Sequence, residues 1–209
     1  MTEIKNKLNV SASPHVRSPK TVRGIMLDVI IALCPALIAS VFLFGPRALA
    51  VTAVCVGVCV LSEYLSRKIM KRSNTTGDLS AIVTGMLLAF NLPASVPLWI
   101  AAIGSVAAIV VVKQLFGGIG QNFVNPALAG RIILLTSFPT AMATWVKPLS
   151  WKTAAVTSAT PLASMYNEAG EFSKDALPSL TDMLIGNRGG CLGEVCAIAL
   201  IIGGLYLVI

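Results

Sequence analysis

The chain has 209 residues, of which 56% are hydrophobic and only 12% are charged, and its mean hydropathy is +0.82. Soluble domains carry about 25% charged residues, so this composition excludes an ordinary soluble protein and predicts a membrane protein. The net charge of +7 does not indicate nucleic-acid binding. The basic residues cluster beside apolar segments, where the cytoplasmic loops of membrane proteins carry them.

After a polar, basic start come about six apolar segments, which we expect at about 25–44, 48–66, 79–90, 97–112, 126–137 and from 191 onward. The first is too long for a signal-peptide core, so we interpret it as a retained anchor. A straight crossing needs about 20 apolar residues, so the third and fifth segments are either tilted or broken helices. The pattern predicts an all-α polytopic membrane protein with a possible internal repeat. Because the chain stops inside an apolar block, we expect it to be the front part of a longer helical bundle.

Lysine and arginine predict the orientation. Basic residues precede the first apolar segment and follow the second, and we place both groups on the cytoplasmic side. The chain then divides into a cytoplasmic segment (1–24), a membrane bundle (25–137), an outer polar loop (138–190) and the start of further membrane helices (191–209). Trp99 and Trp145 fit an outer aromatic belt. If the third segment re-enters without crossing, the long loop changes side.

Two linkers, 73–78 and 116–126, are polar or glycine-rich, and each opens a short apolar segment. Irregular backbone at membrane depth survives only when it is buried in protein or lines a cavity, which favours a cofactor or ion site at these helix starts. The alternative is two ordinary turns with helix caps, in which Asp78 caps one helix and Pro126 opens the next. Both interpretations stay open.

Charged residues within apolar segments are the next clue. They are Asp28, Glu63, Arg131 and Glu194. Such residues usually pair inside the bundle or mark an ion path, and we take Asp28 and Glu194 as ion-path candidates. The alternative is that residues near a segment end reach the headgroups, which is the interpretation we favour for Glu63.

The five cysteines all lie in or at the edge of apolar segments. Cys55 and Cys59 are spaced to share one helix face, so a metal or iron–sulfur site is conceivable. However, no Cys-x-x-Cys pair is present, and a free cysteine behaves as a small buried hydrophobic residue. We interpret the cysteines as packing residues.

Four stretches together resemble one family. They are 13–18 leading into 25–36, the run 117–130 with its Gly-Gln-Asn and Asn-Pro-Ala, the hydroxyl-rich stretch 157–162, and 186–194. Over essentially its whole length the chain resembles the RnfD family, membrane proteins of the Rnf complex, which is the ion-translocating ferredoxin–NAD oxidoreductase of bacterial membranes. It is also similar to the B-type membrane subunit of the sodium-translocating NADH–quinone oxidoreductase.

The resemblance implies a flavin mononucleotide (FMN) joined through its phosphate to Thr160, the last residue of an attachment motif that includes Thr157, Ser158 and Ala159. A transferase would bring the threonine hydroxyl to the pyrophosphate of FAD and displace AMP, with a metal ion stabilising the phosphate oxygens. The following proline biases Thr160 towards extended backbone, which suits presentation of its hydroxyl. The chain departs from the family pattern at Ala154, where an aspartate is frequent.

The resemblance also implies the wider role. The protein would relay electrons between partner subunits of a multi-subunit enzyme in the bacterial cytoplasmic (inner) membrane and couple this to Na⁺ or H⁺ movement, with no complete reaction alone. A partner subunit with its own covalent flavin would face the long outer loop. A second, non-covalent flavin, riboflavin, is a further implication, for which we take residues of the glycine-rich linker: Gly118, Gly120, Asn122 and Asn125.

Aromatic residues near the motif offer stacking surfaces for a flavin, or interface anchors: Trp145, Trp151 and Tyr166. The competing hypothesis is a channel or carrier for a small solute without flavin, built from the two short segments as half-helices around a central site. A third is a purely structural membrane protein. Neither explains the stretch 157–162.

Overall fold

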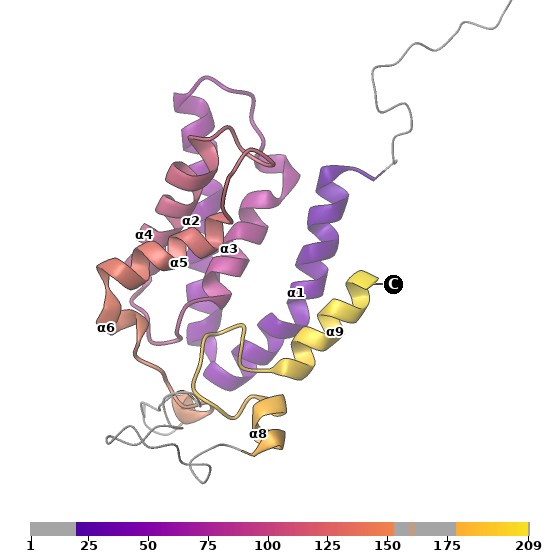
Figure 1. The fold of residues 1–209 in the computed structure, drawn as a ribbon, viewed down its shortest axis with the longest axis vertical. Helices are drawn as coiled ribbons and strands as arrows, with labels where there is room; N and C mark the ends of the chain where they lie inside the picture. Colours follow the sequence, from indigo (N-terminus) through magenta and orange to yellow (C-terminus); the bar gives the residue numbers. More distant parts are fainter. Residues whose placement is uncertain (1–19, 153–159, 161–178, 209) are drawn as a thin grey trace, which may run out of the picture.

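The computed structural model describes residues 20–152, 160 and 179–208. Within these residues the chain forms helices joined by turns, with no strand, which confirms the predicted all-α fold (Figure 1). Two antiparallel helices, α1 (Val22–Phe44) and α2 (Pro46–Ile69), are long and apolar enough to cross a membrane by length and composition.

The turn between α1 and α2 depends on one glycine. Gly45 has a φ of 74°, a region that side-chain-bearing residues rarely adopt, and Pro46 then opens α2 at its first position. The ring of Trp151 also packs over Gly45, where an added Cβ would lie 2.7 Å from a ring carbon. Glycine is therefore required both for the backbone turn and for the close approach of the indole.

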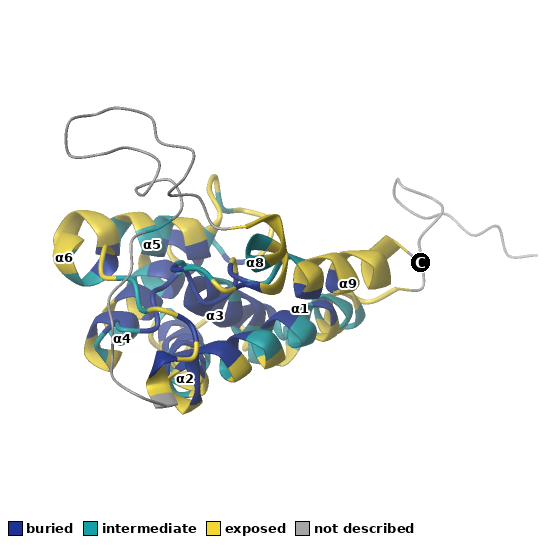
Figure 2. Cartoon of the chain, turned by 90° about the horizontal axis from the view of Figure 1, so that it is seen from below, coloured by how far each residue is buried: buried dark blue, intermediate teal, exposed yellow. Residues whose placement is uncertain are grey.

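The centre of the bundle is built from shorter helices. They are α3 (Ser80–Phe90), α4 (Leu98–Val106), which continues as the π-helix η2 (Ala107–Gln114), and α5 (Pro126–Ser137). Figure 2 shows α3 as the most deeply buried helix, surrounded by the others. Gly85 lets α3 approach α2 closely, because a Cβ there would lie 2.7 Å from the Cα of Val56. A short helix is tolerated here because protein, rather than lipid, surrounds it.

The remaining elements are η1 (Thr76–Asp78), α6 (Pro139–Met142), η3 (Ser150–Lys152), α8 (Leu180–Ile185) and α9 (Ala197–Val208). Helix α9 packs along α1 at one side of the bundle (Figure 1). It begins later than residue 191, where the apolar pattern starts. Residues 191–193 instead lie across the end of α3, where Leu192 N donates to Leu92 O and Gly193 N donates to Phe90 O, both at 3.0 Å.

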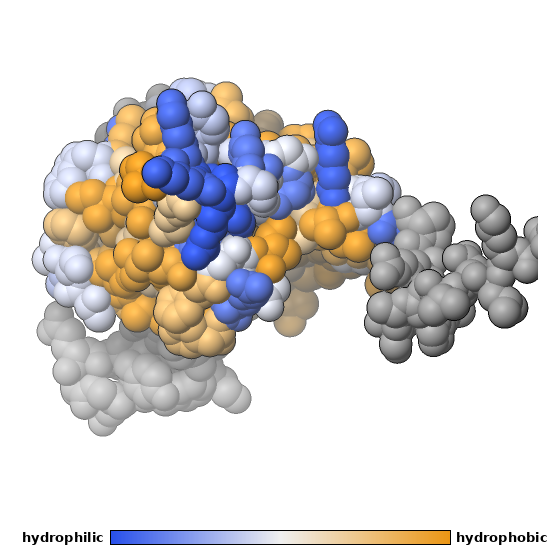
Figure 3. Space-filling view, turned by 90° about the horizontal axis from the view of Figure 1, so that it is seen from above, coloured by the Kyte–Doolittle hydropathy of each residue, from blue (hydrophilic) through white to orange (hydrophobic). Residues whose placement is uncertain are grey.

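The two ends of the bundle differ in charge. We call the end where α1 begins and α2 finishes the basic end, because it carries Arg67, Lys68, Lys71 and Arg72. Figure 3 views the molecule from this end and shows hydrophilic side chains gathered on a largely apolar surface. The α1–α2 turn, the end of α3 and residues 138–152 lie at the opposite end. Large apolar side chains on the flanks, such as Ile38 and Phe42, are exposed, as lipid-facing residues are.

Candidate functional site

The segment that leads to the attachment motif is fixed at the opposite end of the bundle. Leu149 N donates a 2.7 Å hydrogen bond to Leu43 O, and Trp151 covers Gly45. Thr160 itself is partly exposed. The other motif residues and their neighbours lie outside the described residues: Ala154, Thr157, Ser158, Ala159 and Tyr166.

A cavity of about 460 Å³ opens at the basic end, between α1, α3 and the glycine-rich linker. Three of the four linker residues predicted for a second flavin line it: Gly120, Asn122 and Asn125. Its walls are largely apolar, from Val83, Leu87, Ile119 and Phe123, with Ser80 and Lys113 as polar members. Small-molecule sites in proteins are typically about 300–1,000 Å³, mostly apolar, with a few polar groups.

The linker residues play different parts. Asn125 caps α5, because its Oδ1 accepts a 3.0 Å hydrogen bond from Ala127 N, and Asp78 Oδ1 similarly accepts from Ser80 N at 2.9 Å. Pro126 therefore opens α5 as the capping alternative predicts, whereas the N-cap position of α3 is held by Leu79 and not by Asp78; both interpretations of the linkers stay open. Asn122 Oδ1, in contrast, is buried and has no hydrogen-bond partner among the described residues. Gly118 does not line the cavity; it lies against the guanidinium of Arg67, which an added Cβ would overlap.

A buried ion pair joins one residue of the cavity wall, Lys113, to Glu63 on α2. Lys113 Nζ is 2.9 Å from Glu63 Oε2 and donates a 2.6 Å hydrogen bond to Ser80 Oγ. The other carboxylate oxygen of Glu63 accepts from Gln114 Nε2 at 2.9 Å and from Thr75 Oγ1 at 2.8 Å. Both charged side chains are almost fully buried, with exposures of 0% for Glu63 and 2% for Lys113.

The expectation that Glu63 reaches the headgroups is therefore wrong. The sequence places Lys113 at the end of an apolar segment, a position typical of an interface anchor. The wider turn of the π-helix instead brings both Lys113 and Gln114 inside the bundle, and such π segments frequently mark functional sites. The signal available in the sequence was a pair of opposite charges, Glu63 and Lys113, each near the basic end of its segment.

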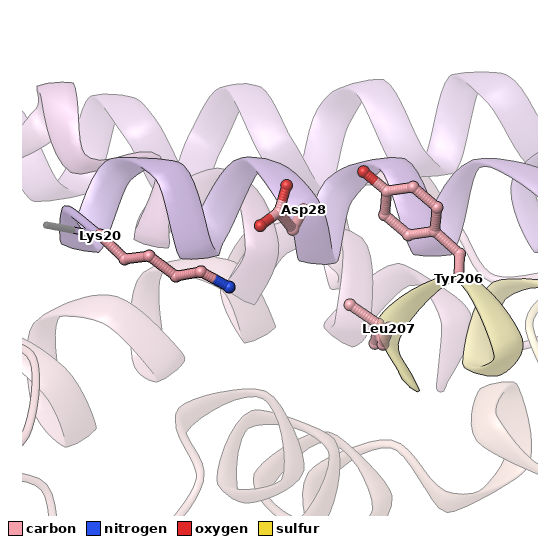
Figure 4. Close-up of a pocket in the computed structure, with 4 residues that line it drawn as sticks. All are labelled: Lys20, Asp28, Tyr206 and Leu207. Atoms are coloured by element: carbon pink, nitrogen blue, oxygen red, sulfur yellow. The ribbon is translucent and has the colours of Figure 1, made fainter. Parts of the chain in front are cut away.

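The two ion-path candidates lie at opposite ends of the bundle. Asp28, on α1, lines a cavity of about 310 Å³ with Lys20 and with Tyr206 and Leu207 of α9. In Figure 4 the side chains of Lys20 and Tyr206 extend towards Asp28 from either side. Glu194, far from this cavity, is 3.4 Å from Arg131 Nη1 and has a side-chain exposure of 55%.

Arg131 connects three segments around Glu194. Its Nη1 donates a 2.7 Å hydrogen bond to Asn91 Oδ1 at the end of α3, in addition to the ion pair with Glu194. Arg188 Nη2 donates to the backbone carbonyl of Glu194 at 3.0 Å. The structure thus brings together two of the predicted membrane charges, Arg131 and Glu194, and keeps Asp28 separate from both.

The cysteines are free thiols within the described chain, and three of them, Cys55, Cys59 and Cys191, are fully buried. Cys59 Sγ lies 3.9 Å from the carbonyl oxygen of Ser105, a packing contact between α2 and α4. No group of three metal-ligating side chains occurs among the residues that the structure describes.

Comparison with known proteins gives relatives over nearly the whole chain. It is 51% identical over 208 residues to the D-type subunit of the Na⁺-translocating ferredoxin:NAD⁺ oxidoreductase complex of Acetobacterium woodii, covering 97% of this chain and 63% of the relative. It is 41% identical over 208 residues to the D-type subunit of the proton-translocating ferredoxin:NAD⁺ oxidoreductase complex of Clostridium ljungdahlii, covering 98% and 63%. The D-type subunit of the ion-translocating oxidoreductase complex of Rhodobacter capsulatus is 34% identical over 223 residues, covering 95% and 62%.

The chain therefore spans about 63% of the length of these relatives. The sequence profile of the NQR2, RnfD, RnfE family matches residues 9–209. This match and the apolar helices together give the protein a membrane location. The chain belongs to the NQR2, RnfD, RnfE family.

Proposed function

We propose that this chain acts in a membrane redox subunit of an ion-translocating ferredoxin:NAD⁺ oxidoreductase complex and carries FMN on Thr160. The observation that carries the proposal is the Ser-Ala-Thr motif, which ends at a partly exposed threonine in a chain of this family. Relatives at 51% and 41% identity are named as D-type subunits of such complexes. Its partners would be the other membrane subunits, one of them with its own covalent flavin.

In the attachment reaction this chain supplies only the hydroxyl group of Thr160. The Thr160 oxygen bonds to the flavin-side phosphorus of FAD, the bond from that phosphorus to the AMP oxygen breaks, and the hydroxyl proton leaves. The exposure of Thr160 gives a transferase access, and the anchoring of Leu149 and Trp151 holds the segment at one end of the bundle. Bound FMN supplies the capacity to accept and release electrons.

We assign the cavity at the basic end to a second, non-covalent flavin, riboflavin. Its volume and apolar walls fit an aromatic ring system. A buried acceptor without a partner costs about 1–3 kcal/mol, and Asn122 Oδ1 would recover this by accepting a ring N–H. Gly120 and Asn125 would form the rim of the flavin site. Gly118 packs against Arg67 instead and does not line the cavity.

The coupling ion, Na⁺ or H⁺, would pass near the membrane charges. Asp28 beside its cavity and Glu194 beside Arg131 are the two candidate positions, one nearer each end of the bundle. By the positive-inside rule the basic end would lie in the cytoplasm of a bacterial cell and Thr160 outside the inner membrane, and the basic residues that end α2 support this orientation.

The decisive experiment is a denaturing gel of the full-length protein from cells that contain the flavin transferase. The wild-type band should fluoresce as flavin, and Thr160→Ala should be dark, because the only attachment oxygen is gone. Thr181→Ala, which removes an exposed threonine on α8, is the matched control and should stay fluorescent. A dark wild-type band would overturn covalent attachment. A solute carrier would instead give flux through liposomes with no flavin.

A further inference from the structure

We propose that Lys113 makes the cavity at the basic end favour reduced flavin over oxidised flavin. The inference rests on the second flavin proposed above. Lys113 is the only charged residue among the described residues that line the cavity. It is therefore the one charged group that the described wall presents to a ring in this cavity.

The geometry of the ion pair gives the electrostatic potential in the cavity its sign. Glu63 is fully buried and does not contribute to the described cavity wall, whereas Lys113 and its hydrogen-bond acceptor Ser80 do. The pair is neutral as a whole, but of its two members only Lys113 lines the cavity. A ring bound there would meet the ammonium first and the carboxylate behind it.

The carboxylate is held in place so that it cannot turn towards the cavity. Gln114 and Thr75 both donate to Glu63 Oε1, while Oε2 faces Lys113. Two of the three ammonium protons of Lys113 have acceptors among the described residues, Glu63 and Ser80. No acceptor for the third proton occurs among the described residues. A charge that the protein holds in place acts on a ligand without first having to reorganise.

An isoalloxazine ring changes charge on reduction. The oxidised ring is neutral; with two electrons and one proton it becomes an anion, with its negative charge near N1 and the adjacent carbonyl. An ammonium in the cavity wall stabilises the anion more than the neutral ring. The role of Lys113 is thus electrostatic. Its effect appears as tighter binding of reduced riboflavin than of oxidised riboflavin.

The test uses the full-length chain in nanodiscs with Thr160→Ala, so that covalent FMN does not contribute to the signal. Riboflavin is titrated in its oxidised form and, without oxygen, after dithionite has supplied two electrons and water one proton. The ratio of the two dissociation constants is the readout. Lys113→Met combined with Glu63→Gln replaces the ion pair by neutral groups and leaves no unpaired buried charge. We expect the preference for reduced riboflavin to fall about tenfold, which is about 30 mV for a two-electron couple.

The controls separate this role from a structural one. Lys68→Met removes an exposed charge at the same end and should leave the ratio unchanged. If the Met-containing pair does not fold, Lys113→Gln with Glu63→Gln tests the same point. An unchanged ratio, or an equal loss of affinity for both forms, would overturn the inference. Absence of riboflavin binding to the Thr160→Ala parent would overturn the second flavin site too, while covalent FMN on Thr160 would stand on its own gel assay.

Discussion

At the scale of single residues, the cluster around Glu63 is held by a buried network of hydrogen bonds. Its carboxylate has three hydrogen-bond donors: Lys113, Gln114 and Thr75. A buried ion pair is weak evidence for stability as such, since desolvation offsets the attraction. Removing one partner is different, because it leaves a charge in the protein interior without compensation.

We therefore expect Lys113→Ala to lower the free energy of unfolding by about 3–5 kcal/mol. The double variant Lys113→Met/Glu63→Gln should recover most of that loss. Lys68→Ala, at an exposed position, should cost no more than about 1 kcal/mol. Denaturant titration in mixed micelles measures all three. Equal losses of unfolding free energy for Lys113→Ala and Lys68→Ala would show that the buried Glu63 carboxylate does not depend on Lys113 for compensation.

At the scale of helices, the crossing of α1 and α9 depends on one glycine whose neighbour in the chain faces open space. Gly203 on α9 sits against the carbonyl oxygen of Ala32 on α1, which an added Cβ would overlap, whereas a Cβ at Gly204 would meet no atom within 4 Å. Small residues at such positions let two helix backbones approach within a membrane. Helix α9 therefore faces α1 with Gly203, whereas Gly204 points away from α1.

This contrast gives a matched pair of substitutions. Gly203→Ala should lower the free energy of unfolding by about 1–3 kcal/mol, because α9 must shift away from α1. Gly204→Ala should be neutral or slightly stabilising, since alanine is the better helix former. The same denaturant titration compares them, and a loss for Gly204→Ala as large as that for Gly203→Ala would contradict the assigned crossing.

The helices could be predicted well from the sequence, because apolar runs and caps are local signals. The predicted range 126–137 matches α5, and the proline that opens it and the asparagine that caps it are both visible in the chain. The contacts of Glu63 could not be predicted, because they join residues about fifty positions apart through a π-helix that hydropathy does not show. Gly118 was misplaced for a similar reason: its partner, Arg67, comes from another helix.

At the scale of the whole molecule, charge and the anchored segment lie at opposite ends. The basic residues end α2, while Leu149 and Trp151 dock on the α1–α2 turn. If the positive-inside rule governs this protein, the two ends face opposite compartments. The orientation then decides which compartment holds the threonine proposed to carry FMN.

Cysteine labelling tests this orientation. In a background whose native cysteines are replaced, Thr181→Cys at the anchored end should react with a membrane-impermeant maleimide in intact cells. Lys71→Cys at the basic end should react only after the cells are opened. Labelling of both in opened cells controls for exposure. The reverse pattern in intact cells would place Thr160 in the cytoplasm.

The backbone bonds of Leu192 and Gly193 to the end of α3 have a consequence for chain entropy. Together with Trp151 on Gly45, they attach the chain to the same end of the bundle on either side of residue 160. The cost of closing a loop grows only with the logarithm of its length, about 0.6 kcal/mol for each doubling. Insertions or deletions between the two attachments and outside α8 should therefore alter the folding free energy little, and the helices that carry the attachments need not change with them.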